Sequence, residues 1–282
     1  MQSTRRTFLK LLGGALVGSC LGPLGGYAYA ARVEPTWLAV ERVTIPLKHL
    51  HSTADGFRIA LMGDFHLHPF TQIAFVREAI ARANALKPDL VVLVGDFVLQ
   101  RADSIFELAP VLAQLNAKHG TFAVLGNHDL WTDAQVVRRG LEQAGLPVLD
   151  NTGVALSIGR ATVYLAGLDD GWSGKPDLRR ALDKQPQDAP TILLAHEPDF
   201  ADKYSQDGRV SLQLSGHSHG GQVRLPGIGA LVLPSFAEKY DQGLYQVNRM
   251  WLYTTRGIGV IGPPVRLNCR PEITEITLVS AG

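Results

Sequence analysis

The sequence predicts an α/β fold in which short buried strands alternate with amphipathic helices. Apolar runs at 58–62, 90–94 and 121–125 each end in polar residues beside glycine, and each is followed by a stretch with helical features. This alternation is typical of βαβ units and a mostly parallel sheet. The chain has 282 residues, 46% of them hydrophobic and 19% charged, which is enough for one substantial core. We therefore expect a single domain over residues 31–282.

The helices between these strands are predicted from spacing and from their end residues. Apolar side chains recur at helical spacing between 72 and 86, where Thr71 can cap the helix and Pro88 stops it. A second helix is expected to begin after Ser104, and a third to span 133–144.

The alternation of strands with long helices ends beyond residue 146. Residues 151–153 resemble a turn between two strands, and later strands are joined by loops rich in Gly and Pro. Two further apolar runs, at 191–195 and 210–214, again lead into polar residues. No internal repeat or shift in composition marks a second domain.

The first thirty residues are predicted to be an export signal. The paired arginines Arg5 and Arg6 precede an apolar, Gly-rich run over 11–27 and a small-x-small sequence at 28–30. This order resembles a twin-arginine signal, and we expect cleavage of residues 1–30. The resemblance implies export by the twin-arginine machinery to the periplasm or the outer face of the cytoplasmic membrane. A retained anchor is the alternative, although the glycines make the run marginal for the ~20 apolar residues of a spanning helix.

The charge balance argues against a nucleic-acid partner. The full chain has 27 basic and 26 acidic residues, and the predicted signal removes Arg5, Arg6 and Lys10 without removing an acid. The mature chain then has 24 basic and 26 acidic residues, a formal charge of −2. No basic patch is present to neutralise a phosphate backbone.

Five predicted strands deliver polar residues at their carboxyl ends, where ligand sites of open α/β sheets form. These residues are Asp64, His66, Asp96, Asn127, His128, His196, His217 and His219. One residue separates Asp64 from His66 and His217 from His219, so an extended backbone would place both members of each pair on one side. Carboxylate, imidazole and amide donors suit Mn²⁺, Zn²⁺ or Fe²⁺.

The order of these motifs resembles that of the calcineurin-like metallophosphoesterases. The match in D-x-H, GD, GNHD, H and GHSH covers residues 58–222, and the sequences at 216–222, 255–259 and 270–273 resemble an exported phosphodiesterase branch of bacterial envelopes. The resemblance implies a four-layer αββα sandwich, in which two mixed β-sheets are flanked by helices.

The resemblance also implies roles for individual residues. One divalent ion would be held by Asp64, His66 and His219, the other by Asn127, His196 and His217, and Asp96 would bridge them. The ions, with manganese favoured over zinc or iron, would lower the pKa of a shared water that attacks phosphorus. His128 would stabilise the developing charge and protonate the leaving group. His68 has no ligand role in the family pattern.

Two departures from the pattern argue against a phosphoprotein substrate and against a tyrosinate-Fe³⁺ site. Leu99 and Gln100 stand where many protein phosphatases of the superfamily have an aspartate and an arginine, and where purple acid phosphatases have an iron-binding tyrosine in place of the aspartate. Either a backbone carbonyl or Asp129 must then orient His128. Arg256 is a substitute phosphate contact by resemblance, or a surface loop residue.

Three kinds of function remain open at this point. The first is hydrolysis of a small phosphodiester or pyrophosphate. The second is hydrolysis of a lipid-linked substrate of the UDP-2,3-diacylglucosamine kind, and Trp37, Trp172 and Trp251 permit peripheral membrane contact. The third is a non-catalytic binding module on the same scaffold.

Overall fold

The computed structural model describes residues 25–281. Most of the predicted export signal, residues 1–24, lies outside this range. Residues 25–32 are helical, and the helix continues across the predicted cleavage point after Ala30. Within residues 25–281, no helix is both long and apolar enough to cross a membrane.

The first sheet contains five strands in the order β1-β13-β2-β3-β4. All neighbouring strands in it are parallel except β13 and β2. Its strands are β1 (Ala39–Leu47), β2 (Phe57–Met62), β3 (Leu90–Val94), β4 (Thr121–Val124) and β13 (Glu272–Ser280). The strands expected at 58–62, 90–94 and 121–125 are thus confirmed to within a residue.

The second sheet contains six strands in the order β11-β12-β8-β7-β6-β5, with antiparallel strands at both edges. They are β5 (Thr152–Ile158), β6 (Ala161–Gly167), β7 (Thr191–Leu194), β8 (Val210–Ser215), β11 (Gly243–Val247) and β12 (Met250–Thr254). The turn expected at 151–153 is wrong, because β5 already begins at Thr152. The chain reverses instead at Gly159, where the positive φ that a tight turn requires is free of steric cost.

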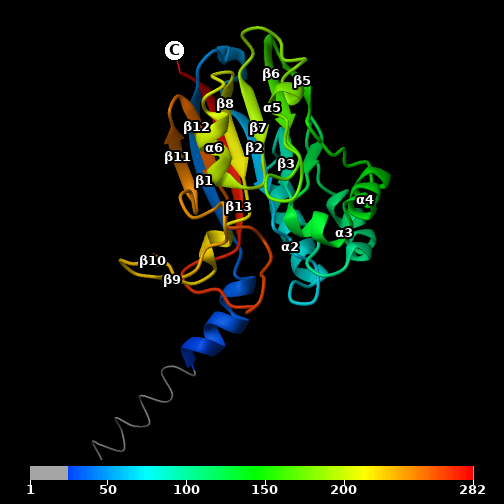
Figure 1. Ribbon diagram of the computed structural model, residues 1–282, viewed down its shortest axis with the longest axis vertical. Helices are drawn as coiled ribbons and strands as arrows, with labels where there is room; N and C mark the ends of the chain where they lie inside the picture. The colour runs from blue at the N-terminus through cyan, green and yellow to red at the C-terminus, as the bar shows by residue number, and fades with distance from the viewer. Residues whose placement is uncertain (1–24, 282) are drawn as a thin grey trace, which may run out of the picture.

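Helices cover the outer faces of both sheets, as Figure 1 shows. The helices are α2 (Ile73–Ala85), α3 (Ile105–Leu112), α4 (Asn127–Gln143), α5 (Leu178–Ala181) and α6 (Ala201–Tyr204). The first three pack on the first sheet, and the last two on the second. Alternate residues of β3 and β7, such as Val92 and Ile192, meet between the sheets, whereas Leu93 and Leu193 face the helices. The four-layer αββα sandwich of two mixed sheets is confirmed.

One expected helix cap is wrong, and one expected helix has an additional segment before it. Thr71 does not cap α2, since its hydroxyl accepts from Val260 N (3.3 Å) and Gln72 occupies the N-cap. The helix expected over 133–144 is confirmed as the second segment of α4: Asp133 has non-helical backbone angles, and its carboxylate accepts from Gln135 N (3.0 Å) and Val136 N (3.1 Å) and caps this segment. A further helical segment that was not expected precedes it from Asn127, where the Asp129 carboxylate accepts from Gly126 N.

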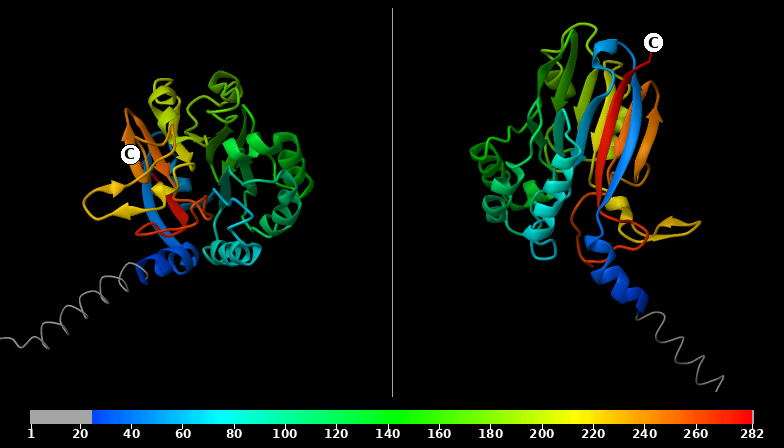
Figure 2. Two further views of the ribbon diagram at one scale, coloured as in Figure 1. Left: turned by 60° about the horizontal axis from the view of Figure 1, so that its bottom comes forward. Right: turned by 180° about the vertical axis from the view of Figure 1, so that it is seen from behind.

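Long loops gather at the end of the molecule where β2, β3, β7 and β8 finish. They contain the short hairpin of β9 (Arg224–Leu225) and β10 (Gly229–Ala230). The remaining elements along the chain are single 3₁₀ turns: η1 (Glu34–Thr36), η2 (Ser52–Ala54), η3 (Ala102–Ser104), η4 (Pro198–Phe200) and η5 (His219–Gly221). Figure 2 shows that the hairpin and the helical residues 25–32 lie at this same end.

Candidate metal centre

The structure brings the predicted carboxylate and histidine ligands together between the carboxyl edges of the two sheets. They form two groups in which the ligand atoms lie within 4.8 Å of one another. The first group is Asp64, His66, Asp96 and His219, and the second is Asp96, His196 and His217. All six side chains are buried. Asp96 is the member that the groups share.

Asp96 stands between the groups. Its Oδ2 atom lies 3.3 Å from His66 Nε2 and 3.2 Å from His196 Nε2. Its Oδ1 atom accepts a hydrogen bond from the backbone N–H of His128 (2.9 Å). One carboxylate oxygen is therefore in reach of both groups while the other fixes the side chain.

The backbone of the ligand residues is not extended, which corrects the alternation argument. Strands β2 and β8 end at Met62 and Ser215, before the ligand pairs. Asp64, His66, Asp96, His217 and His219 all have positive φ, between 45° and 69°. Each pair therefore faces the centre because left-handed residues turn the chain beyond the strand end. Such conformations are unfavourable for residues with a side chain, and they cluster at functional sites.

Backbone carbonyls fix which nitrogen of two histidines faces the centre. His196 Nδ1 donates to Val94 O (2.6 Å), and His217 Nε2 donates to Ser235 O (2.9 Å). The remaining atoms, His196 Nε2 and His217 Nδ1, lie 3.3 Å apart. Carbonyl partners of this kind orient metal-binding histidines and set their tautomer.

Burial controls the charge of the cluster. It lowers the pKa of His66 to about 3 and of His217 to about 4, and it holds the pKa of His219 well below its usual value. It raises the pKa of the Asp64 carboxyl to about 7. Burial also opposes charge on His196, but the adjacent Asp96 carboxylate outweighs it and raises the pKa of that imidazole. Neutral imidazoles are the form that binds metal ions.

Asn127 and His128 follow β4 directly and begin α4. The Asn127 Oδ1 atom is buried and has no hydrogen-bond donor. A Cβ atom at the preceding Gly126 would lie 2.4 Å from Asp96 Oδ1, so only glycine permits the close approach of this segment to the cluster. The His128 ring lies 4.8 Å from that of His66.

A backbone carbonyl, and not Asp129, faces the His128 ring. His128 Nδ1 lies 3.4 Å from Leu99 O. Asp129 accepts instead from Phe97 N (2.9 Å), Val98 N (3.2 Å) and Gly126 N (3.0 Å), and burial raises its pKa to about 8. Asp129 therefore joins the loops after β3 and β4.

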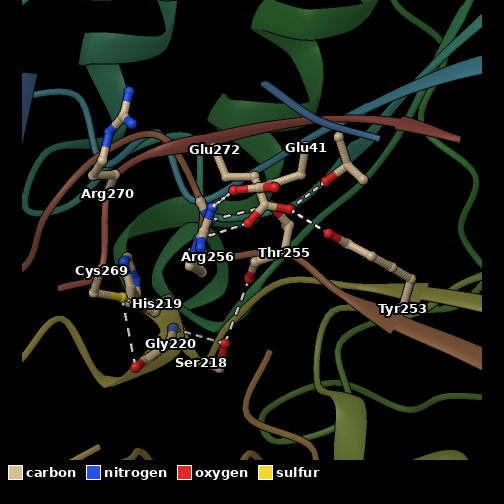
Figure 3. Close-up of polar contacts among 12 residues, drawn as sticks. Glu41, Ser218, His219, Gly220, Tyr253, Thr255, Arg256, Cys269, Arg270 and Glu272 are labelled. Atoms are coloured by element: carbon tan, nitrogen blue, oxygen red, sulfur yellow. Dashed lines mark hydrogen bonds and ion pairs between the residues drawn. The ribbon is translucent and has the colours of Figure 1, made fainter. Parts of the chain in front are cut away.

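His68 and Arg256 both lie outside the cluster. His68 Nε2 pairs with Glu107 Oε2 at 2.8 Å on the surface. Arg256 is ion-paired with Glu41 (2.6 Å) and Glu272 (2.7 Å), and Glu272 also accepts from Tyr253 OH (2.7 Å), as Figure 3 shows. Arg256 is thus neither a free phosphate contact nor an exposed loop residue.

Arg266 is a structural residue that sequence reasoning missed. Its side chain is 0% exposed, and its guanidinium donates to Cys269 O (2.9 Å), Arg256 O (2.8 Å) and Gly259 O (2.6 Å). Gly259 N in turn donates to Asp64 O (2.7 Å). Arg266 therefore holds the loop that supports Asp64. An arginine between apolar residues in a Gly- and Pro-rich loop was the available signal.

Cys269 supports the centre from the same side. Its thiol donates to His219 O (3.1 Å), and both residues are labelled in Figure 3. The backbone N–H of Cys269 donates to the buried carboxylate of Glu34 (2.5 Å), which ties the segment after residue 30 to the loop behind the centre.

Trp131 and Trp172 form an aromatic rim along one side of the centre. Sequence reasoning missed this rim, although Trp172 is one of the tryptophans said to permit membrane contact. The Trp131 ring lies 4.8 Å from that of His128, and the Trp172 ring lies 5.7 Å from that of His217. Buried Glu197 accepts from Trp172 N (3.1 Å) and so places this loop; burial raises its pKa to about 8. The adjacency of Glu197 to His196 could have drawn attention to it.

Comparison with known proteins agrees with this geometry. Residues 57–221 match the family model of calcineurin-like phosphoesterases. The chain belongs to the calcineurin-like phosphoesterase family and is a metal-dependent phosphoester hydrolase.

Its relatives include bacterial proteins of the same length. It is 36% identical to the metallophosphoesterase YkuE of Bacillus subtilis, over 98% of both chains. It is 32% identical to the phosphodiesterase YaeI of Escherichia coli, over 98% of this chain and 99% of that protein. A transmembrane protein with a metallophosphoesterase domain from Danio rerio is 33% identical over 85% of this chain and 57% of its own length.

Proposed function

We propose that this protein hydrolyses phosphodiester or pyrophosphate bonds in the bacterial envelope, at a centre of two divalent ions. The position of Asp96 carries the proposal. One of its carboxylate oxygens lies within 3.3 Å of a histidine from each of the two groups, which is the arrangement that a bridging ligand requires.

The residues present fit two cations. His66 Nε2 and His219 Nε2 lie 2.9 Å apart with neutral rings, and the other ring nitrogen of each is buried without a partner. Asp64 Oδ2 and Asn127 Oδ1 are likewise buried acceptors without a donor. Buried acceptors without donors are costly, and a cation satisfies several at once.

We assign one ion to Asp64, His66 and His219, the other to Asn127, His196 and His217, and the bridging position to Asp96. The two ions, when bound, would neutralise charge on the phosphoryl group and lower the pKa of a water nucleophile. Among metals that accept this mixed set of donors we favour manganese over zinc and iron.

His128 is the residue that we assign to the leaving group. It lies beside the cluster without belonging to either group, and its partly buried ring has Nδ1 directed at Leu99 O. Its Nε2 atom is then the one that can stabilise charge on phosphorus and donate a proton to the departing oxygen. Water adds to phosphorus as the ester P–O bond breaks, and the alcohol leaves with this proton.

The assay that tests this function compares three substrates with the manganese-loaded protein. We expect hydrolysis of bis-p-nitrophenyl phosphate to exceed that of the monoester p-nitrophenyl phosphate. A nucleotide-sugar lipid pyrophosphate tests the lipid-linked alternative. Inactivity on all three with two ions bound would contradict the proposal and favour a binding module.

Replacement of His128 tests its role separately. We expect His128→Gln to lower kcat for bis-p-nitrophenyl phosphate about 10²-fold or more, in the range typical of general acids. The metal content, measured by inductively coupled plasma mass spectrometry, should stay at two ions per chain. His68→Gln is the matched control, since His68 pairs with Glu107 on the surface, and it should keep full activity. Loss of metal in His128→Gln would assign His128 a ligand role instead.

We also propose export by the twin-arginine route. The paired arginines, apolar run and small-x-small sequence support it. The experiment is fractionation of cells that make the parent protein or the Arg5→Lys/Arg6→Lys variant. Export requires that the parent protein reach the periplasm or membrane and that the variant stay in the cytoplasm. The mass of the purified protein distinguishes cleavage after Ala30 from a retained anchor.

A further inference from the structure

An apolar cavity lies directly beside the metal centre. It has a volume of about 360 Å³, and His219 and Ser218 form part of its wall. Aliphatic side chains provide most of the rest, among them Val223, Leu233 and Val265. His219 belongs both to this wall and to the metal cluster, so the cavity and the centre are direct neighbours.

The polar side chains in the wall offer no free hydrogen-bonding groups apart from His219. Gln222 donates to Ile261 O (3.3 Å) and Pro263 O (3.2 Å), and its Oε1 accepts from Ile261 N (2.8 Å). Ser218 Oγ accepts from Gly220 N (3.0 Å). The ligand chemistry that the wall suits is therefore apolar, since a buried polar ligand group would lose its hydrogen bonds to water.

The entrance to the cavity is apolar as well. Leu231 and Val232 line it and are 53% and 75% exposed, and Ile228 at the tip of the β9–β10 hairpin is 72% exposed. Between residues 223 and 236 the one charged side chain is Arg224, which is paired with Asp241 at 2.6 Å. Adjacent exposed aliphatic residues of this kind mark an interaction site for an apolar ligand or surface.

The position of the hairpin favours a lipid over another apolar ligand. It projects from the end of the molecule at which the helical residues 25–32 also emerge, as Figure 1 and the right view of Figure 2 show. In the retained-anchor alternative this end would face the membrane, because residues 25–32 continue an apolar run that begins at residue 11. The cavity is lined by aliphatic and not aromatic side chains, whereas the aromatic residues Trp131 and Trp172 stand beside His128 and His217.

We propose that this cavity binds an aliphatic chain of the substrate, so that the substrate class is an amphiphilic phosphodiester of the phospholipid kind. The phosphoryl group would lie at the metal centre and the chain along Val223, Leu233 and Val265, while the hairpin contacts the lipid surface. This inference rests on the proposed hydrolase function and names its substrate class.

The test uses alkyl p-nitrophenyl phosphates with methyl, butyl and octyl chains, below their critical micelle concentrations. Water adds to phosphorus, the P–O bond to the aryl group breaks, and p-nitrophenolate and the alkyl phosphate are released. With the full-length, manganese-loaded protein, kcat/KM should rise about 2- to 4-fold for each methylene that enters the cavity. The leaving group is constant, so the rise measures binding of the chain.

A variant locates the effect in the cavity. Val265→Phe should flatten the dependence on chain length, measured as the ratio of kcat/KM for the octyl ester to kcat/KM for the methyl ester within the same variant. The matched control is Val33→Phe, a half-exposed position outside the cavity, which should keep the parent dependence. If Val265→Phe does not fold, as judged by circular dichroism, Val223→Phe narrows the same cavity.

The outcomes separate the two proposals. Hydrolysis of the methyl ester without any dependence on chain length overturns the inference. It means that something else fills the cavity, such as a second copy or the apolar N-terminal segment. A dependence that Val265→Phe leaves unchanged also overturns it. If none of the three esters is hydrolysed, the proposed hydrolase function fails instead.

Discussion

The two sheets bring different chemistry to one centre. The first sheet supplies both carboxylates and the amide, Asp64, Asp96 and Asn127, together with His66, whereas the second supplies histidines alone. Each group of ligand atoms takes members from both sheets. The centre is therefore complete only when the sheets are packed face to face, which the apolar layer between them ensures. Metal binding and the packing of the sheets are thus linked in free energy.

Replacement of Asp96 should have the largest effect, because it is the one ligand common to both groups. We expect Asp96→Ala to lose both ions and to lower kcat/KM at least about 10³-fold, since metal ions supply several kcal/mol of charge stabilisation. His217→Ala, which removes a ligand of the second group alone, should retain one ion. Metal content per chain and hydrolysis of bis-p-nitrophenyl phosphate measure both. Retention of two ions by Asp96→Ala would show that neither group depends on Asp96 as a shared ligand.

Arg266 tests how the loop after the second sheet supports a ligand of the first. Arg266→Met should lower the free energy of unfolding by about 2–4 kcal/mol, because it leaves buried carbonyls without a donor. Arg270→Met is the control, since Arg270 is only partly buried: it stacks on exposed Trp37 and donates to Trp37 O (2.8 Å) and to Leu38 O (2.9 Å), which also accepts from Arg82 (3.3 Å). It should have a smaller effect. Urea unfolding with both ions bound gives the measurement. Equal effects of the two substitutions would show that the buried hydrogen bonds of Arg266 contribute no more to the free energy of unfolding than the contacts of Arg270.

The sequence reveals the two sheets unequally, for a physical reason. Strands β3 and β7 are buried on both faces, so each is a continuous apolar run with a polar residue at its end. The edge strand β5 has exposed residues in every other position over part of its length, and its start was mistaken for a turn. Patterns that burial imposes on neighbouring residues are visible in a sequence, and patterns that depend on strand pairing are not.

Some features of the candidate site are likewise visible in the sequence, and others are not. The residues that we assign as ligands follow strand ends and recur in family order, so the motifs alone pick them out. Arg266, Glu197 and the apolar cavity depend on residues far apart in the chain; Arg266, for example, lies beside Ala30, whose carbonyl accepts from its backbone N–H. The left-handed backbone of the ligands was also hidden, because Asp and His adopt it only where the surrounding structure holds them there.

The smallest effect that we predict concerns the helices that cover the second sheet, and it is a change in stability with pH. On the second sheet, short helix α6 is tied by Asp202 to Lys239 (2.7 Å) and to Tyr240 OH (2.8 Å). The hydrogen bond from Lys239 lowers the pKa of Asp202 below its value in the unfolded chain. The stability that it contributes is therefore present above about pH 4 and is lost as pH falls through the lowered pKa.

Asp202→Asn should remove this pH dependence. The Tm of the metal-free protein should fall by about 1–2 °C at pH 7, as for other exposed pairs. This fall should shrink as the pH decreases through the lowered pKa, where the parent carboxylate becomes protonated as well. The difference between parent and variant at each pH is measured by differential scanning calorimetry, which cancels the titration of the metal ligands. The effects of Asp202→Asn and Lys239→Met should not add at pH 7, because both remove the same interaction. Full additivity would show that the pair contributes nothing, and that the second sheet depends on apolar packing as fully as the first.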